Sequence, residues 1–184
     1  MQRNLKPIVH EILSGYPLPI NGYHGLGHWA RVLENGIRLA AVTKANLAVV
    51  SLFAVLHDSR RQNECHDPDH GLRGAELAVE LRGRLFELSD DELSLLFLAC
   101  EGHTRERTHS DKTIQTCWDS DRLDLGRVGV TPHPKWLSTA AAKSKEMINW
   151  ADGRSRFHVV PDFVAGEWGI VVDDDRSPGP FKRP

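Results

Sequence analysis

Histidine and aspartate residues that could bind a metal ion occur at three separate places in the sequence. His28 stands alone, the pair His57-Asp58 follows a strongly apolar stretch, and Asp121 belongs to the segment DSDRLD. Imidazole and carboxylate groups together suit divalent transition metals, and a charged aspartate directly after an apolar helix needs a partner if it is buried. Neighbouring residues are about 100° apart on an ideal helix, so His57 and Asp58 can reach one ion only near a helix end, which the polar residues 59–61 supply. We therefore expect an enzyme with a metal site.

Helices are expected to position these residues, because apolar residues recur with helical spacing in most of the chain before residue 150. Ser89 and Glu92 have the spacing of a capping box, and Asp111 and Ser138 are further candidate caps. The expected helices span residues 5–13, 25–41, 47–57, 70–81, 90–102, 112–125 and 138–150. The pattern predicts an all-α bundle.

The residues after Gly153 have a different character. Segments 157–160 and 168–172 are rich in β-branched and aromatic residues, which favours a short β-hairpin, with an irregular extension as the alternative. Residues 173–184 concentrate charge, proline and glycine and are expected to be mobile. We therefore predict a helical metal-binding domain over residues 1–152 and a partly mobile C-terminal extension over residues 153–184.

Length and charge narrow the class of protein. The 184 residues suffice for one domain with a buried core, and the net charge of −2 argues against binding of duplex nucleic acid. The chain has no apolar run long enough to cross a bilayer and no signal peptide, and its three cysteines form no CxxC pair. We expect a cytoplasmic protein without a membrane partner, and nothing in the sequence indicates an oligomeric state.

In their order along the chain, these residues resemble a known family. His28, His57-Asp58 and Asp121 look like the four-part signature of the HD-domain metal-dependent phosphohydrolase superfamily, over roughly residues 24 to 130. The segments AVLHDSRR and DSDRLDLGRVG carry most of the similarity. The resemblance implies an HD-domain helical bundle in which these four side chains hold one divalent ion. Asp121 is carried over as the last ligand, with Asp119 as the alternative.

Two further histidines match branches of the family that hold two metals. His70, which opens HGLRGAELA, and His103, in CEGHT, follow the order of the extra histidines in those branches. A second ion held by His70 and His103 would share Asp58 as a bridge. In the alternative, His70 caps its helix and His103 contacts substrate phosphate. The implied cofactor is one or two divalent ions, of Mn, Fe, Ni, Co, Zn or Mg.

The resemblance also implies a reaction. A bound divalent ion lowers the pKa of water and offsets the negative charge that grows on a phosphoryl group. Asp58 could take a proton from water, although its role as a ligand is stronger, and Arg31, Arg60 and Arg61 are candidates to bind phosphate. The expected activity is hydrolysis of a small phosphate ester, such as a nucleotide-type monoester or diester. The alternatives are a regulatory HD domain without turnover and a two-iron oxygenase on the same fold.

Overall fold

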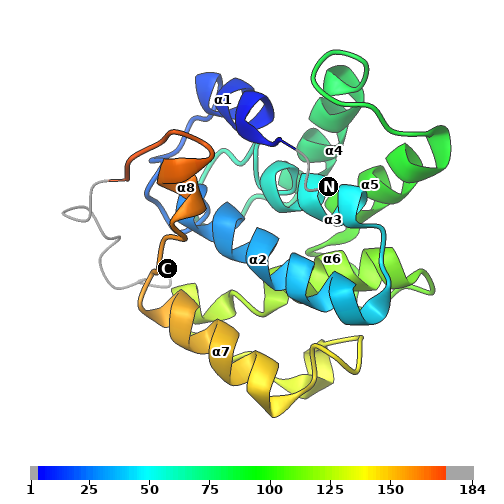
Figure 1. The fold of residues 1–184 in the computed structure, drawn as a ribbon, viewed down its shortest axis with the longest axis vertical. Coiled ribbons are helices and arrows are strands. Elements are labelled where there is room, and N and C mark those ends of the chain that lie inside the picture. Colours follow the sequence, from blue (N-terminus) through cyan, green and yellow to red (C-terminus); the bar gives the residue numbers. More distant parts are fainter. Residues whose placement is uncertain (1–3, 173–184) are drawn as a thin grey trace.

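The computed structural model describes residues 4–172, which form a helical structure (Figure 1). Over these residues the chain forms eight α-helices and two short 3-10 helices, and the only β-type pairing is an isolated bridge between Arg82 and Phe86. The elements in chain order are α1 (Lys6–Ser14), α2 (Leu26–Thr43), α3 (Leu47–Leu56), α4 (His70–Leu81), α5 (Asp90–Gly102), α6 (Lys112–Arg122), η1 (Leu125–Val128), η2 (Pro134–Trp136), α7 (Lys145–Arg156) and α8 (Phe163–Gly166). The predicted all-α class is confirmed.

Helix α3 lies at the centre of the bundle. Its residues 49–56 are all buried, as expected for a helix that is apolar on every side. Helices α2, α4, α5 and α6 surround it and contact it (Figure 1). Because α3 ends inside this ring of helices, the chain carries His57 and Asp58 directly into the interior.

Side-chain caps fix where three of the helices begin. Asn46 accepts hydrogen bonds from two backbone N–H groups at the start of α3, and Asp111 does the same at α6. Ser89 and Glu92 form the expected capping box at α5. These three helices supply or lead into His57, His103 and Asp121, so the caps help to set the position of the candidate ligands along each helix.

The prediction of a helix over residues 138–150 is wrong in its boundaries. Helix α7 begins at Lys145, where the Ser144 side chain accepts from the Met147 N–H. The backbone N–H groups of Ser138 and Thr139 instead donate to the Asp119 carboxylate, at 2.7 and 2.8 Å, which holds this segment in a turn. The extension predicted from residue 153 therefore starts inside α7.

The predicted hairpin is not formed by the described residues. The N–H groups of His158 and Val159 donate to carbonyl groups of α7. In the second segment, the N–H groups of Trp168 and Ile170 donate to carbonyl groups of α8. Both segments therefore complete the ends of short helices and do not pair with each other. Trp168 is buried and its carbonyl accepts from His10 Nε2, so the segment does cover apolar surface beside α1.

Two other expectations concern membranes and the chain end. Among residues 4–172, no helix is both long and apolar enough to cross a membrane. Residues 173–184, which are expected to be mobile, lie outside the residues that the structure describes.

Candidate metal centre

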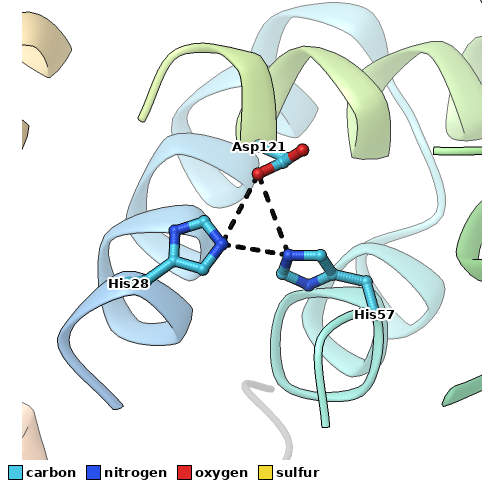
Figure 2. Close-up of side chains that lie close together, drawn as sticks. All are labelled: His28, His57 and Asp121. Atoms are coloured by element: carbon cyan, nitrogen blue, oxygen red, sulfur yellow. Dashed lines mark hydrogen bonds and ion pairs between the residues drawn. The ribbon is translucent and has the colours of Figure 1, made fainter. Parts of the chain in front are cut away.

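Three predicted ligands from three different helical segments face one another (Figure 2). His28 lies in the first turns of α2, His57 directly follows α3, and Asp121 lies in the last turn of α6. His28 Nε2 is 3.1 Å from His57 Nε2 and 3.5 Å from Asp121 Oδ1. His57 Nε2 is 3.8 Å from the same Asp121 oxygen. The three atoms surround a common point at which a metal ion could be held.

Asp58 contacts both this group and a second pair of histidines, His70 and His103. Its Oδ2 is 3.5 Å from His28 Nε2 and 3.7 Å from His57 Nε2. Its Oδ1 is 3.0 Å from His70 Nε2 and 3.7 Å from His103 Nε2. His70 is the first residue of α4 and His103 directly follows α5. The fold therefore brings all six predicted ligand residues together around one buried carboxylate.

The four histidines are all oriented in the same way. In each ring, Nδ1 points out of the cluster at an oxygen that can only accept a hydrogen bond. The acceptors are Asp124 Oδ2 for His28, the Phe53 carbonyl for His57, the Asp67 carbonyl for His70 and the Cys100 carbonyl for His103. Each Nδ1 therefore carries the ring proton, and each Nε2 directs an unprotonated lone pair into the cluster.

This set of donor atoms fits a divalent metal ion. Two lone pairs 3.1 Å apart, on His28 and His57, repel each other unless a cation lies between them. Asp121 Oδ1 is buried and makes no hydrogen bond, and its nearest guanidinium, that of Arg127, is 3.8 Å away, so this oxygen is available to a metal ion. Imidazole nitrogens combined with carboxylate oxygens are typical ligands of transition metals. The geometry thus supports the ligand roles that the sequence predicts for His28, His57, Asp58 and Asp121.

The protonation states also suit metal binding. Burial lowers the pKa of His57 to about 3, so its imidazole is neutral at pH 7, as a ligand must be. Burial alone would raise the pKa of Asp58, but its interactions with His57 and with the other three histidines hold it well below its usual range. Burial would likewise lower the pKa of His103, yet its contact with Asp58 raises it. Asp58 is therefore an ionised carboxylate and the centre of negative charge in the cluster.

Asp119, the alternative last ligand, has a different set of contacts. Its two oxygens accept from the Ser138 N–H, the Thr139 N–H and the Thr139 hydroxyl, at 2.7, 2.8 and 2.7 Å. These bonds tie the segment before α7 to α6. With its oxygens already bonded, Asp119 acts as a structural residue, and the geometry favours Asp121 as the ligand.

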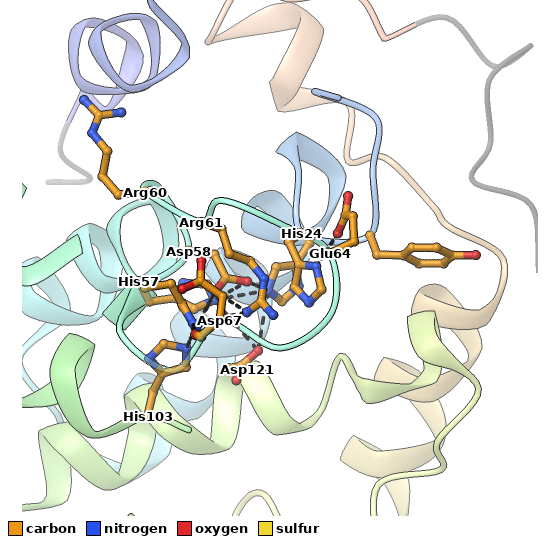
Figure 3. A network of polar contacts seen from close by, with 12 residues as sticks. His24, His57, Asp58, Arg60, Arg61, Glu64, Asp67, His103 and Asp121 are labelled. Atoms are coloured by element: carbon orange, nitrogen blue, oxygen red, sulfur yellow. Dashed lines mark hydrogen bonds and ion pairs between the residues drawn. The ribbon is translucent and has the colours of Figure 1, made fainter. Parts of the chain in front are cut away.

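The three arginines considered for phosphate binding lie in different environments. Arg31 is buried, and its Nε and Nη2 donate to Asp124 at 2.7 and 3.0 Å, so the phosphate-binding role predicted for it does not fit the structure. Arg60 points away from the cluster (Figure 3) and donates to the Ile12 carbonyl. Arg61 lies at the site, with Nη1 3.4 Å from Asp58 Oδ1. Of the three, Arg61 remains the candidate for contact with substrate.

Two residues that contact the candidate ligands were not predicted from the sequence. Asp124 accepts from His28 Nδ1 at 2.8 Å, and Arg127 Nη2 lies 3.8 Å from Asp121 Oδ1. Both follow Asp121 at helical spacing, which is a signal that could have suggested them. His24 shares a helix with His28, but its Nδ1 pairs with Glu64 outside the cluster (Figure 3).

Comparison with known proteins agrees with this picture. No family model matches the chain, and no curated protein matches it in sequence. Among solved structures, it is similar to the crystal structure of a predicted HD superfamily hydrolase from an uncultured Thermotogales bacterium. The two are 27% identical, the match covers 81% of this chain and 83% of the other, and the TM-score is 0.60. The structural match confirms the resemblance seen in the sequence: the chain has the fold of an HD-domain protein.

Proposed function

We propose that the chain is a metal-dependent phosphohydrolase that acts on a small phosphate ester of the nucleotide type. The observation that carries the proposal is that four imidazole groups gather around the buried Asp58 carboxylate, with Asp121 beside two of them. The similarity to a structure described as a predicted HD superfamily hydrolase supports hydrolysis as the reaction class.

Four side chains would hold the metal ion, namely His28, His57, Asp58 and Asp121. A divalent ion held there would lower the pKa of water and offset the charge that develops on a phosphoryl group. Asp58 would be one of these ligands, and its Oδ1, which faces His70 and Arg61, would be the oxygen that could accept a proton from water. Because its pKa is held well below the usual range, Asp58 would be a weak base, and its role as a ligand is the larger one.

Arg61 bears on whether one or two ions bind. Its Nη1 lies 3.4 Å from Asp58 Oδ1 and 3.1 Å from His70 Nε2, so the guanidinium competes with a second cation for the same atoms. We therefore expect one metal ion per chain, with His70, His103 and Arg61 placed to contact the substrate phosphate. A metal-to-protein ratio near one at saturating Mn, unchanged in His70→Ala and His103→Ala, is the expected result. A ratio near two that falls to one in both variants would assign a second ion to these histidines.

The regulatory domain and the two-iron oxygenase remain the alternatives. A domain that had lost catalysis would be expected to lack some ligands, whereas all six candidate residues are present and converge. An oxygenase would be purified with two iron ions per chain. The identity of the bound metal therefore separates these classes.

The proposal is tested by elemental analysis of protein purified without chelator, followed by a phosphatase screen. The screen would use nucleotide monoesters and diesters with Mn, Co, Ni and Mg. Phosphate release that requires both the metal and an intact site is the expected result. A metal-loaded protein that releases no phosphate from any of these substrates would favour the regulatory alternative.

Substitution of single ligands tests the site itself. Asp58→Ala and Asp121→Ala should each lose most of the bound metal while remaining folded, and Asp119→Ala serves as the matched control because it removes a neighbouring buried carboxylate. Stoichiometric metal in the Asp58→Ala variant would rule out the assignment.

A further inference from the structure

The pair formed by Asp124 and Arg31 lies directly behind His28. Asp124 Oδ2 accepts from His28 Nδ1 at 2.8 Å, and both Asp124 oxygens accept from the Arg31 guanidinium, at 2.7 and 3.0 Å. Asp124 is 1% exposed and Arg31 is 4% exposed, so water screens these charges little. A bidentate pair of this kind fixes both the charge and the orientation of the carboxylate.

Arg31 makes a third contact, with the segment after α7. Its Nη1 donates to the Val159 carbonyl at 3.1 Å. The residue before it, His158, has a φ of 49°, a left-handed conformation that side chains other than glycine rarely adopt. This conformation follows the end of α7 and turns the chain back toward α2. A continuous series of hydrogen bonds thus runs from Val159 through Arg31 and Asp124 to His28.

The packing beside this contact is tight. A Cβ atom built on Gly27 would lie 3.3 Å from Arg31 Nη1 and 3.5 Å from Val160 Cγ2. The α2 backbone, the arginine and the residues after α7 therefore meet with little spare room. Three hydrogen bonds, two to Asp124 and one to the Val159 carbonyl, hold the Arg31 guanidinium at this point.

We propose that Asp124 and Arg31 are positioning residues, which couple the segment of residues 157–160 to the metal ligand His28. The inference rests on the metal site of the proposed function. Asp124 holds the proton on His28 Nδ1 and keeps the Nε2 lone pair directed at the ion. Arg31 keeps Asp124 in the orientation that this requires, and the Val159 carbonyl holds the third donor of Arg31. The affinity for metal then depends on a segment that supplies no ligand.

Metal titration of four variants tests the positioning role. Asp124→Asn, Arg31→Met and Arg31→Lys would be compared with Asp119→Asn, which alters a buried carboxylate that does not contact His28. Asp124→Asn should weaken Mn binding by roughly 10- to 100-fold, the usual effect of losing such a partner. Arg31→Met should weaken it although Arg31 touches no ligand, Arg31→Lys should restore part of the loss, and Asp119→Asn should leave the affinity unchanged. In a protein that already carries Asp124→Asn, Arg31→Met should weaken Mn binding little further, because Arg31 acts on His28 through Asp124.

Nitrogen NMR of the imidazole rings in metal-free protein supplies a readout that a general loss of stability would not move. The parent should show His28 protonated at Nδ1, and Asp124→Asn should show a mixture of the two tautomers. If the parent binds no metal at all, the proposed function fails, while the tautomer of His28 still tests the role of Asp124. An unchanged tautomer together with unchanged Mn affinity in Asp124→Asn would overturn the inference.

The coupling to residues 157–160 is tested by the effect of metal binding on that segment. If the segment affects the affinity for metal, metal binding must stabilise the segment in return. Addition of Mn should slow hydrogen exchange at the Val159 N–H, which donates to the Arg154 carbonyl. The slowing should persist in Arg31→Lys and disappear in Arg31→Met. An exchange rate at Val159 that does not respond to Mn in the parent would contradict the coupling.

Discussion

Replacement of Gly74 by alanine should show how closely α4 must approach the end of α3 for the site to form. A Cβ atom at Gly74 would lie 2.4 Å from the Leu56 carbonyl oxygen and 3.2 Å from that of His57. Real Cβ atoms essentially never come within 3.0 Å of another heavy atom of this kind. Both oxygens belong to the backbone, so neither can rotate away. The two helices would have to separate.

The expected size of the effect follows from two opposing contributions. Alanine is favoured over glycine inside a helix by about 1 kcal/mol. Overpacking of a well-packed contact costs typically about 1–3 kcal/mol. We expect the clash to win, because its partners are backbone atoms, with a net loss of up to about 2 kcal/mol. For a domain of this length, that corresponds to a decrease in Tm of up to roughly 8 °C. The clash also falls on the carbonyl oxygen of His57, a proposed ligand, so the affinity for metal should fall as well.

Gly153→Ala is the matched control. Gly153 also lies inside a helix, α7, but no atom lies within 4 Å of a Cβ built there. This variant should be more stable than the parent by about 0.5–1 kcal/mol, because only the helix preference of alanine acts. Thermal unfolding of the metal-free proteins, followed by circular dichroism, measures both changes. If Gly74→Ala raised Tm as Gly153→Ala does, the close approach of α4 would not be a constraint and the reasoning would be refuted.

Three further outcomes are expected. Asp119→Ala should lower the free energy of unfolding by about 1–3 kcal/mol, because two backbone N–H groups and a hydroxyl lose their acceptor. It should not lose metal. Denaturant unfolding and elemental analysis measure the two quantities. Burial raises the pKa of Asp67, but the hydrogen bond from Arg73 outweighs this and holds the pKa below its usual value. A carboxylate whose pKa is lowered by folding stabilises the fold above its unfolded pKa, so Arg73→Met should be less stable than the parent at neutral pH. Unfolding curves should show the difference in free energy of unfolding between the two proteins shrinking below about pH 4. A constant difference down to about pH 3 would contradict this. A chain ending at residue 172 should bind metal as the parent does. A chain ending at residue 153 should melt at a lower temperature than the parent, because it loses the buried Trp168. An equal Tm would contradict the packing observed beside α1.

Much of the helical fold could be predicted from local patterns. The apolar run before His57 is readable as a central helix because its side chains are apolar on every side. The caps at Ser89 and Asp111 depend on atoms only two or three residues away, so they are visible in the sequence. The segments after residue 153 were harder to predict, because β-branched and aromatic residues are typical of strands but here follow α7 and α8 and donate hydrogen bonds to their carbonyl groups.

The candidate ligands could also be named from the sequence, because their order and local motifs match a family. The positions of these residues in the sequence do not show which side-chain atoms come into contact in the folded chain. Asp119 and Asp121 are alike in sequence, and only the packing of α6 points one at the residues before α7 and the other at His28. Arg31 shows the same limit: it lies three residues from the candidate ligand His28, but its partner, Asp124, lies far along the chain.

The sequence by itself determined the helical class, the positions of most helices and the set of residues able to bind a metal. The tertiary structure decided which of them share a centre, which way each imidazole faces, and that Arg31 pairs with Asp124 next to His28. The physical reason is that helix formation and capping depend on contacts within about one turn of the chain. The orientation of a buried histidine or arginine depends on a hydrogen-bond partner supplied by another element, and only the folded packing brings that partner into place.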